Sequence, residues 1–139
     1  MAKIQLLAVL SLDGSIWDIK TEGKQSAWLV ASEIEKFKED AAFEIPFGYP
    51  LSMLFSARED STKSVYLVEA TEESADYINS ILRVRAIDEM VIYTVPQITG
   101  TENRLFLNNL PASSWVLVEH RAYKNGVVRN IYRLKSVNK

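Results

Sequence analysis

The segment Ser114–Leu134, with the sequence SWVLVEHRAYKNGVVRNIYRL, contains two strand-like runs separated by Asn125 and Gly126. Valine, isoleucine, leucine and aromatic residues, which are common in strands, fill both runs. An Asn-Gly pair can adopt positive φ at both central positions of a type I′ turn. The segment therefore predicts an antiparallel β-hairpin with this turn at its tip.

Length and composition place this hairpin in an ordinary globular protein. The chain has 139 residues, of which 47% are hydrophobic and 24% are charged. A chain of this length can bury a core without help from metals or cross-links. We therefore expect residues 1–139 to form a single domain.

Charge and cysteine content exclude several classes of function. The net charge is −2, and the basic residues are scattered among acidic ones, so we expect no nucleic-acid partner. The chain has no cysteine, which excludes disulfides, thiolate nucleophiles and cysteine-based metal sites and is consistent with a cytoplasmic protein. The apolar run near the start is too short to span a membrane, so we expect no membrane partner.

The first half of the chain predicts a buried strand and a helix. The nearly continuous apolar run Ile4–Leu10 is typical of a central strand that is covered on both faces. After a turn-rich loop, Ser32 and Glu35 have the spacing of a capping box, which predicts a helix starting at Ser32. Trp28 and Leu29 could instead extend this helix backwards.

The middle of the chain is less regular. Two prolines and a glycine within Asp40–Pro50 predict a break in regular structure. We expect strands at Leu51–Phe55 and at Ser64–Val68. Only about seven residues separate them, which is fewer than a parallel crossover needs, so we do not expect them to be parallel neighbours.

A second helix and another strand follow. Thr71 is a suitable N-cap, and acidic residues after it suit the positive end of a helix dipole. Ala75, Ile78 and Ile81 share the face that should be buried. The run Ile87–Val95 predicts a strand. The pattern indicates an α/β fold: a mixed, mainly parallel sheet flanked by helices, with an antiparallel C-terminal hairpin.

Several segments, in this order, resemble the dihydrofolate reductase-like superfamily, particularly bacterial proteins related to the reductase domain of riboflavin biosynthesis. They are IQLLAVLSLDG (4–14), VYLVEAT (65–71), RAIDEMVIYTVP (85–96) and LVEHRAYKNGVV (117–128), with a weaker match at PLSMLFSAR (50–58). The resemblance implies an NADPH-dependent reductase that acts on a pterin-like or pyrimidine-like heterocycle. It also implies a homodimer, formed through an edge strand or the hairpin.

The resemblance implies site residues as well. It makes Asp13 and Glu69 the catalytic candidates, and it places Ser56, Arg58, Ala70, Thr71 and Glu72 beside the cofactor.

Each of these assignments has a structural alternative. Asp13 followed by a glycine is also a common turn pair. Glu69 could bond to the start of the next helix. Ser56 and Arg58 could belong to a solvated turn, where nearby acidic residues would neutralise the arginine.

Two departures from the family bear on function. The paired glycines that let a pyrophosphate approach a helix N-terminus are replaced by Ala70 and Thr71, and two glutamates follow them. The family's "gly-arg-x-thr" turn is missing from residues 40–50, and region 40–63 is short. One hypothesis is therefore an NADPH-dependent reductase. The other is a non-catalytic relative that acts as a ligand-binding or self-associating module.

Overall fold

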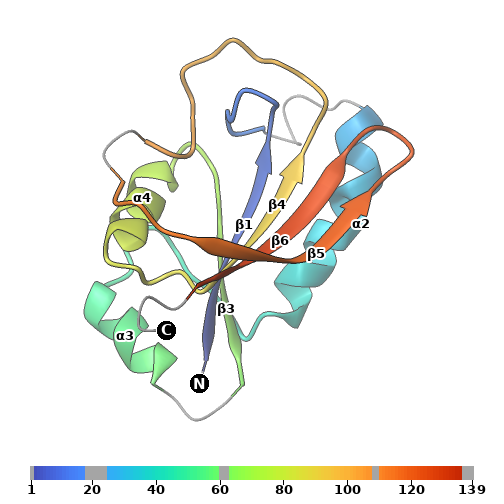
Figure 1. Cartoon of the computed structure of the whole chain (residues 1–139). Coiled ribbons are helices and arrows are strands. Elements are labelled where there is room, and N and C mark those ends of the chain that lie inside the picture. The colour runs from blue at the N-terminus through green and yellow to red at the C-terminus, as the bar shows by residue number, and fades with distance from the viewer. Residues whose placement is uncertain (1, 18–24, 60–62, 108–109, 136–139) are drawn as a thin grey trace.

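The computed structural model describes residues 2–17, 25–59, 63–107 and 110–135, with only the backbone described for residues 25–30. These residues form a six-stranded sheet flanked by three helices (Figure 1). The strands are β1 (Lys3–Leu10), β2 (Phe43–Glu44), β3 (Val65–Glu69), β4 (Glu89–Thr94), β5 (Trp115–Ala122) and β6 (Val128–Leu134). The helices are α2 (Gln25–Asp40), α3 (Leu51–Arg58) and α4 (Ala75–Arg83).

The sheet is mixed and mainly parallel, as predicted. Its strand order is β2-β3-β1-β4-β6-β5. The pairs β2–β3, β1–β3 and β1–β4 are parallel, whereas β6 is antiparallel to both β4 and β5. The predicted central strand and the C-terminal hairpin are therefore both confirmed.

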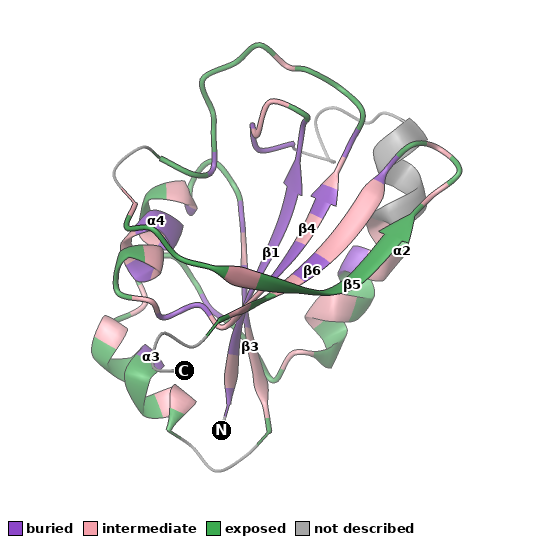
Figure 2. Ribbon diagram, viewed as in Figure 1, coloured by how far each residue is buried: buried purple, intermediate pink, exposed green. Residues whose placement is uncertain are grey.

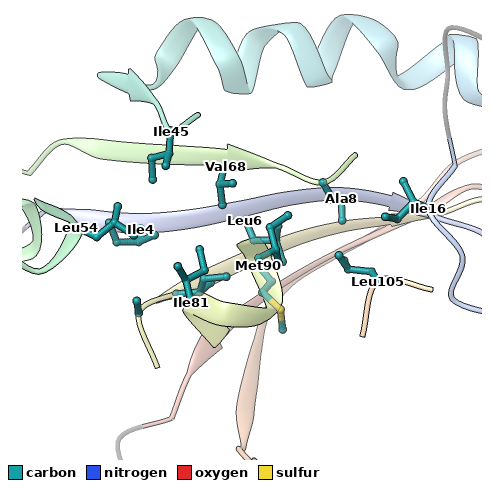
Figure 3. Packing of buried hydrophobic residues seen from close by; sticks show 14 of the residues in the cluster. Ile4, Leu6, Ala8, Ile16, Ile45, Leu54, Val68, Ile81, Met90 and Leu105 are labelled. Atoms are coloured by element: carbon teal, nitrogen blue, oxygen red, sulfur yellow. The ribbon is translucent and has the colours of Figure 1, made fainter. Parts of the chain in front are cut away.

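β1 lies at the centre of the hydrophobic core, because helices cover both of its faces. Ile4 and Leu6 point to the side of α3 and α4, where they pack with Ile81 of α4 (Figure 3). Leu7 and Val9 point to the opposite side, which α2 covers. Almost every residue of the strand is buried, as Figure 2 shows. This burial explains the continuous apolar run in the sequence.

The tip of the hairpin differs from the predicted type I′ turn. Gly126 has a φ of +91°, but among the described non-glycine residues only Arg85 has a positive φ, so Asn125 does not. The amide of Gly126 donates to the carbonyl of Tyr123, and Tyr123 pairs with Val127. The loop therefore has three residues and ends on a glycine in the left-handed conformation. An Asn-Gly pair is compatible with this loop as well as with a type I′ turn.

Two further elements differ from the prediction. The segment expected to be a strand at Leu51–Phe55 is part of helix α3, which starts after Pro50 and buries Leu54. A short apolar run has the same pattern in a buried strand and in a short helix, so periodicity could not separate the two. Helix α2 begins at Gln25, so Ser32 lies inside it and does not cap it. The backward extension was the correct alternative.

The two edges of the sheet are unequal. β2 has only two residues, whereas β5 has eight and leaves Val116, Leu117 and Val118 exposed. A register shift between Leu117 and Glu119 interrupts the pairing of β5 with β6. Bulges and charged residues are common devices at exposed edges. The homodimer that the resemblance implies stays a prediction.

None of the helices in the described part of the chain combines the length and the apolar character that a membrane span requires.

Candidate ligand-binding cleft

A cleft of about 680 Å³ lies between α2 and the carboxyl ends of β1 and β3. Leu7 and Val9 of β1 form its apolar floor, with Trp17 and with Ile34 of α2 beside them. Ligands of open α/β sheets bind at the carboxyl ends of strands, so this cleft is in the expected place. Its remaining described lining residues are Ile16, Ala31, Glu35, Lys38, Glu69, Ala70, Thr71, Glu72, Glu73, Thr99, Thr101 and Asn103.

The turn that follows β3 is closed by its own side chains. The amide of Thr71 donates to Oγ of Ser74 at 2.8 Å, and the amide of Ser74 donates to Oγ1 of Thr71 at 3.1 Å. The Ser74 hydroxyl in turn donates to the carbonyl of Glu69 at 2.7 Å. Helix α4 starts at Ala75, one turn later than predicted, and its N-cap is Ser74 and not Thr71. The amides of Thr71 and Ser74, which face this turn, therefore already have acceptors.

Two glutamates of this segment form contacts at the rim of the cleft. Glu69 forms an ion pair with Lys38 of α2, in which Nζ of Lys38 and Oε1 of Glu69 lie 3.0 Å apart. Glu72 accepts a hydrogen bond from the side chain of Asn103 at 2.7 Å. Burial acts to lower the pKa of Lys38, but the hydrogen bond and charge of Glu69 outweigh burial and raise that pKa above its ordinary value. Lys38 is therefore cationic at neutral pH.

The Asp13 side chain links the loop after β1 to the loop after β4 through hydrogen bonds. Its carboxylate accepts hydrogen bonds from the Ser11 hydroxyl, from the amide of Thr99 at 3.3 Å and from the amide of Gly100 at 3.0 Å. The bond from Ser11, followed by those from the two amides, holds the pKa of Asp13 at about 2. A carboxyl group with this pKa is ionised at neutral pH and has no proton to donate. The geometry thus favours the turn-forming alternative.

The site residues predicted from the sequence lie in the cleft, beside the cleft and on helix α3. Glu69, Ala70, Thr71 and Glu72 line the cleft together. Asp13 contacts one of the lining residues from outside.

Ser56 and Arg58 lie on α3 and are not among the residues that line the cleft. Arg58 pairs with Asp88 at 2.6 Å and donates to the carbonyl of Arg85, so Asp88, beside β4, neutralises its charge. The Asp88 carboxylate also accepts the amide of Ile4 at 2.9 Å. Arg58 therefore has a structural role at the amino end of β1.

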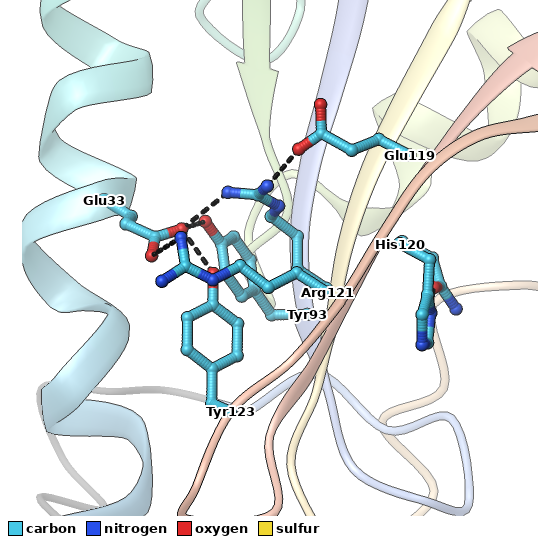
Figure 4. Close-up of polar contacts among 8 residues, drawn as sticks. Glu33, Tyr93, Glu119, His120, Arg121 and Tyr123 are labelled. Atoms are coloured by element: carbon cyan, nitrogen blue, oxygen red, sulfur yellow. Dashed lines mark hydrogen bonds and ion pairs between the residues drawn. The ribbon is translucent and has the colours of Figure 1, made fainter.

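Sequence analysis missed a second polar group, which we call the Glu33 cluster (Figure 4). The Glu33 carboxylate of α2 accepts hydrogen bonds from Tyr93 at 2.8 Å, Tyr123 at 2.6 Å and Arg129 at 2.8 Å. Arg121 lies 3.7 Å from its other oxygen. The cluster joins α2 to β4 and to the hairpin.

The contacts within the Glu33 cluster shift the pKa values of its members. Burial acts to raise the pKa of Glu33, but the hydrogen bonds from Tyr123 and Tyr93 and the charge of Arg129 lower it below its ordinary value. Burial and the bond to Glu33 raise the pKa of Tyr93 far above its usual range. The carboxylate stays ionised and the phenol stays neutral, as in a structural network.

One signal in the sequence pointed to this cluster. Tyr93 lies in the middle of a buried strand, and a buried phenol needs a hydrogen-bond partner. Arg129, two residues from Ile131, is on the inward face of β6 and needs a counter-charge. The partner itself could not be identified, because Glu33 is distant from both in sequence.

The described residues contain no group of three or more histidine, cysteine, aspartate or glutamate side chains that could hold a metal ion.

Comparison with known proteins identifies the fold. No protein-family model matches the chain, and no curated protein sequence does so. RibD of Acinetobacter baumannii has 13% identity and a TM-score of 0.69, and the match covers 98% of this chain but 59% of that one. A pyrimidine reductase-like protein from Corynebacterium diphtheriae has 12% identity and a TM-score of 0.62, with 96% and 92% covered.

Dihydrofolate reductase from Enterococcus faecalis, in complex with NADP(H), matches at 9% identity with a TM-score of 0.60, over 96% of this chain and 97% of that one. Likeness at such low identity shows the fold. The chain therefore has the dihydrofolate reductase-like fold, as its sequence predicted.

Proposed function

We propose that this chain uses a dihydrofolate reductase-like fold to bind a small, flat heterocycle of the pyrimidine or pterin class, without a dinucleotide. On this proposal it is a ligand-binding protein that has kept the cleft of a reductase and lost the position for the cofactor's diphosphate.

The turn after β3 carries this proposal. A diphosphate needs free amide groups and little negative charge at a helix N-terminus. Here the amides of Thr71 and Ser74 are bonded to side-chain hydroxyls. Glu72 and Glu73 line the same end of the cleft and would repel phosphate. These residues do not fit the diphosphate of NADPH.

The apolar part of the cleft suits a flat ring. Its floor is apolar, being formed by Leu7, Val9 and Ile34, and Trp17 lies beside it. Ligand pockets are generally apolar with a few polar groups that fix orientation. Lys38 and Glu69 supply such groups at the rim.

A second candidate function is the NADPH-dependent reductase. It is favoured by the fold, which is shared with an enzyme solved in complex with NADP(H), and by the position of the cleft at the carboxyl ends of the strands. The two candidates differ in whether the dinucleotide binds.

Thermal unfolding with added ligands separates the two candidates. A ligand at a hundredfold excess over its Kd stabilises a fold by about 2.7 kcal/mol, which raises Tm by several degrees. We expect uracil or pterin to raise Tm and millimolar NADPH to leave it unchanged. A clear rise with NADPH, together with its oxidation in the presence of a heterocycle, would instead establish the reductase.

A further inference from the structure

We propose that the ion pair between Lys38 and Glu69 sets the charge of the ligand that the cleft accepts. Glu69 occupies the position at Lys38 that the carboxylate of a ligand would take. The preferred ligand is then a flat heterocycle that carries one carboxylate and displaces Glu69 from Lys38. This inference rests on the proposed ligand-binding function of the cleft.

The ion pair joins two walls of the cleft. Lys38 extends from α2 and Glu69 ends β3, and both side chains line the cleft. Their charged atoms lie 3.0 Å apart. Among the described residues that line the cleft, Lys38 is the only one with a basic side chain. An anionic group on a ligand would therefore be directed to Lys38.

The two partners differ in burial. The Lys38 side chain is 19% exposed, whereas that of Glu69 is 39% exposed. A largely buried ammonium group is unstable without an acceptor, but a more exposed carboxylate can turn to water. Glu35 also pairs with Lys38, but at a longer distance of 3.9 Å and through a side chain that is 67% exposed. Release of Glu69 therefore leaves Lys38 with only its weaker partner Glu35, until a ligand carboxylate takes the place of Glu69.

The exchange should cost little. Ion pairs that remain accessible to water contribute at most about a fivefold factor to an equilibrium, so Glu69 can leave Lys38 at a small cost in free energy. A ligand carboxylate restores one negative charge at Lys38. A phosphate group brings more negative charge close to Glu72 and Glu73, which line the same cleft. The surroundings of Lys38 thus favour a carboxylate over a phosphate.

Orotate and uracil test this inference as matched probes, because they share a pyrimidine ring and only orotate carries a carboxylate. Their affinities would be measured by calorimetry for the wild type and for Glu69→Ala, Lys38→Met and the double variant. In Glu69→Ala, we expect the affinity for orotate to rise about fivefold, because the ligand no longer has to displace Glu69, while uracil changes less than about twofold. The double variant should lose this gain.

Glu72→Ala is the control for a general loss of negative charge, because Glu72 lines the cleft but bonds to Asn103 and not to Lys38. It should change orotate binding much less than Glu69→Ala. An equal rise in both variants would overturn the role of Lys38. Uracil binding with no gain for orotate in Glu69→Ala would overturn this inference and leave the proposed function standing. If neither ring bound to any folded variant, both would be overturned.

Discussion

The two polar regions that contact α2 are built in opposite ways. In the Glu33 cluster, one carboxylate has bonds from two tyrosines and an arginine, contributed by distant parts of the chain. At the cleft, Lys38 has a main partner in Glu69, and water reaches both. The first arrangement holds the helix on the sheet. The second can exchange its partner for a ligand.

This difference separates stability from binding. A carboxylate with a shifted pKa is often taken as a sign of a functional site, although structural networks shift pKa values too. Glu33 has such a shift, but its bonding capacity is used within the fold. Asp13 is similar, because Ser11 and two backbone amides use its oxygens. The cleft can bind a ligand because its polar side chains are less tightly bonded within the fold.

Removal of the Glu33 carboxylate should have the largest effect on stability. Glu33→Ala leaves the buried Tyr93 hydroxyl without its acceptor and takes one anion from Arg129. We expect the free energy of unfolding to fall by about 3 kcal/mol. Thermal and urea unfolding should show a decrease in Tm of about 10 °C.

Glu35→Ala provides the matched control on the same helix. The Glu35 side chain is 67% exposed and its partner Lys38 is 3.9 Å away, so we expect a change within about 0.5 kcal/mol. Equal losses in Glu33→Ala and Glu35→Ala would mean that the Glu33 cluster holds α2 no better than a surface ion pair.

Reopening the turn after β3 should create a site for phosphate. We expect a variant with Ala70→Gly, Thr71→Gly, Glu72→Gln and Glu73→Gln to bind NADPH more tightly than the wild type, by about 2 kcal/mol or thirtyfold. Calorimetry with NADPH measures the change. The matched control keeps both glycines and the two native glutamates. No gain in the full variant would show that another part of the cleft excludes the cofactor.

Asp13→Asn should cause a smaller loss of stability than Glu33→Ala. The asparagine oxygen can still accept one amide hydrogen bond, but the charge that strengthens all of these bonds is lost. Hydrogen exchange of the Thr99 and Gly100 amides should become faster. If exchange and Tm stayed unchanged while a ligand bound more weakly, Asp13 would belong to the binding machinery after all.

Acid should weaken the fold through the same carboxylates. The pKa of Asp13 falls from 3.8 to about 2 on folding, and that of Glu33 falls below 4.5. Groups with a lowered pKa contribute stability that is present above the unfolded pKa and is lost as the pH falls through the folded value. Urea midpoints should therefore be level above about pH 5 and decline towards pH 2. This decline should be shallower in Glu33→Ala, and an unchanged slope would contradict the assignment.

The sequence contained most of the fold because its main signals are local. β1 was predictable from one apolar run, and the hairpin was predictable from two strand-like runs around Gly126. Helix α3 was not predictable, because five apolar or small residues after Pro50 suit either structure. The prediction of a type I′ turn was wrong for a related reason, because an Asn-Gly pair occurs in more than one loop geometry.

The site was predictable only in part. The resemblance directed attention to the residues after β3, and four of the candidates do line one cleft. The contribution of Lys38 was missed, because nothing near it in sequence indicates that α2 lies against the end of β3. The Glu33 cluster was missed because Glu33 lies 60 to 96 positions away from the residues that donate to it. Such contacts depend on topology, which single-sequence patterns describe poorly.

The position of β1 also affects how the chain acquires its structure during translation. β1 leaves the ribosome before both of its neighbours, and it pairs with β3 from Val65 and with β4 up to Thr94. Contacts between residues so far apart form slowly, because a long loop must close first. The most apolar strand of the nascent chain therefore stays unpaired until β3 has been synthesised and keeps one open edge until β4 follows, and chaperones that recognise exposed apolar segments would meet it during this interval.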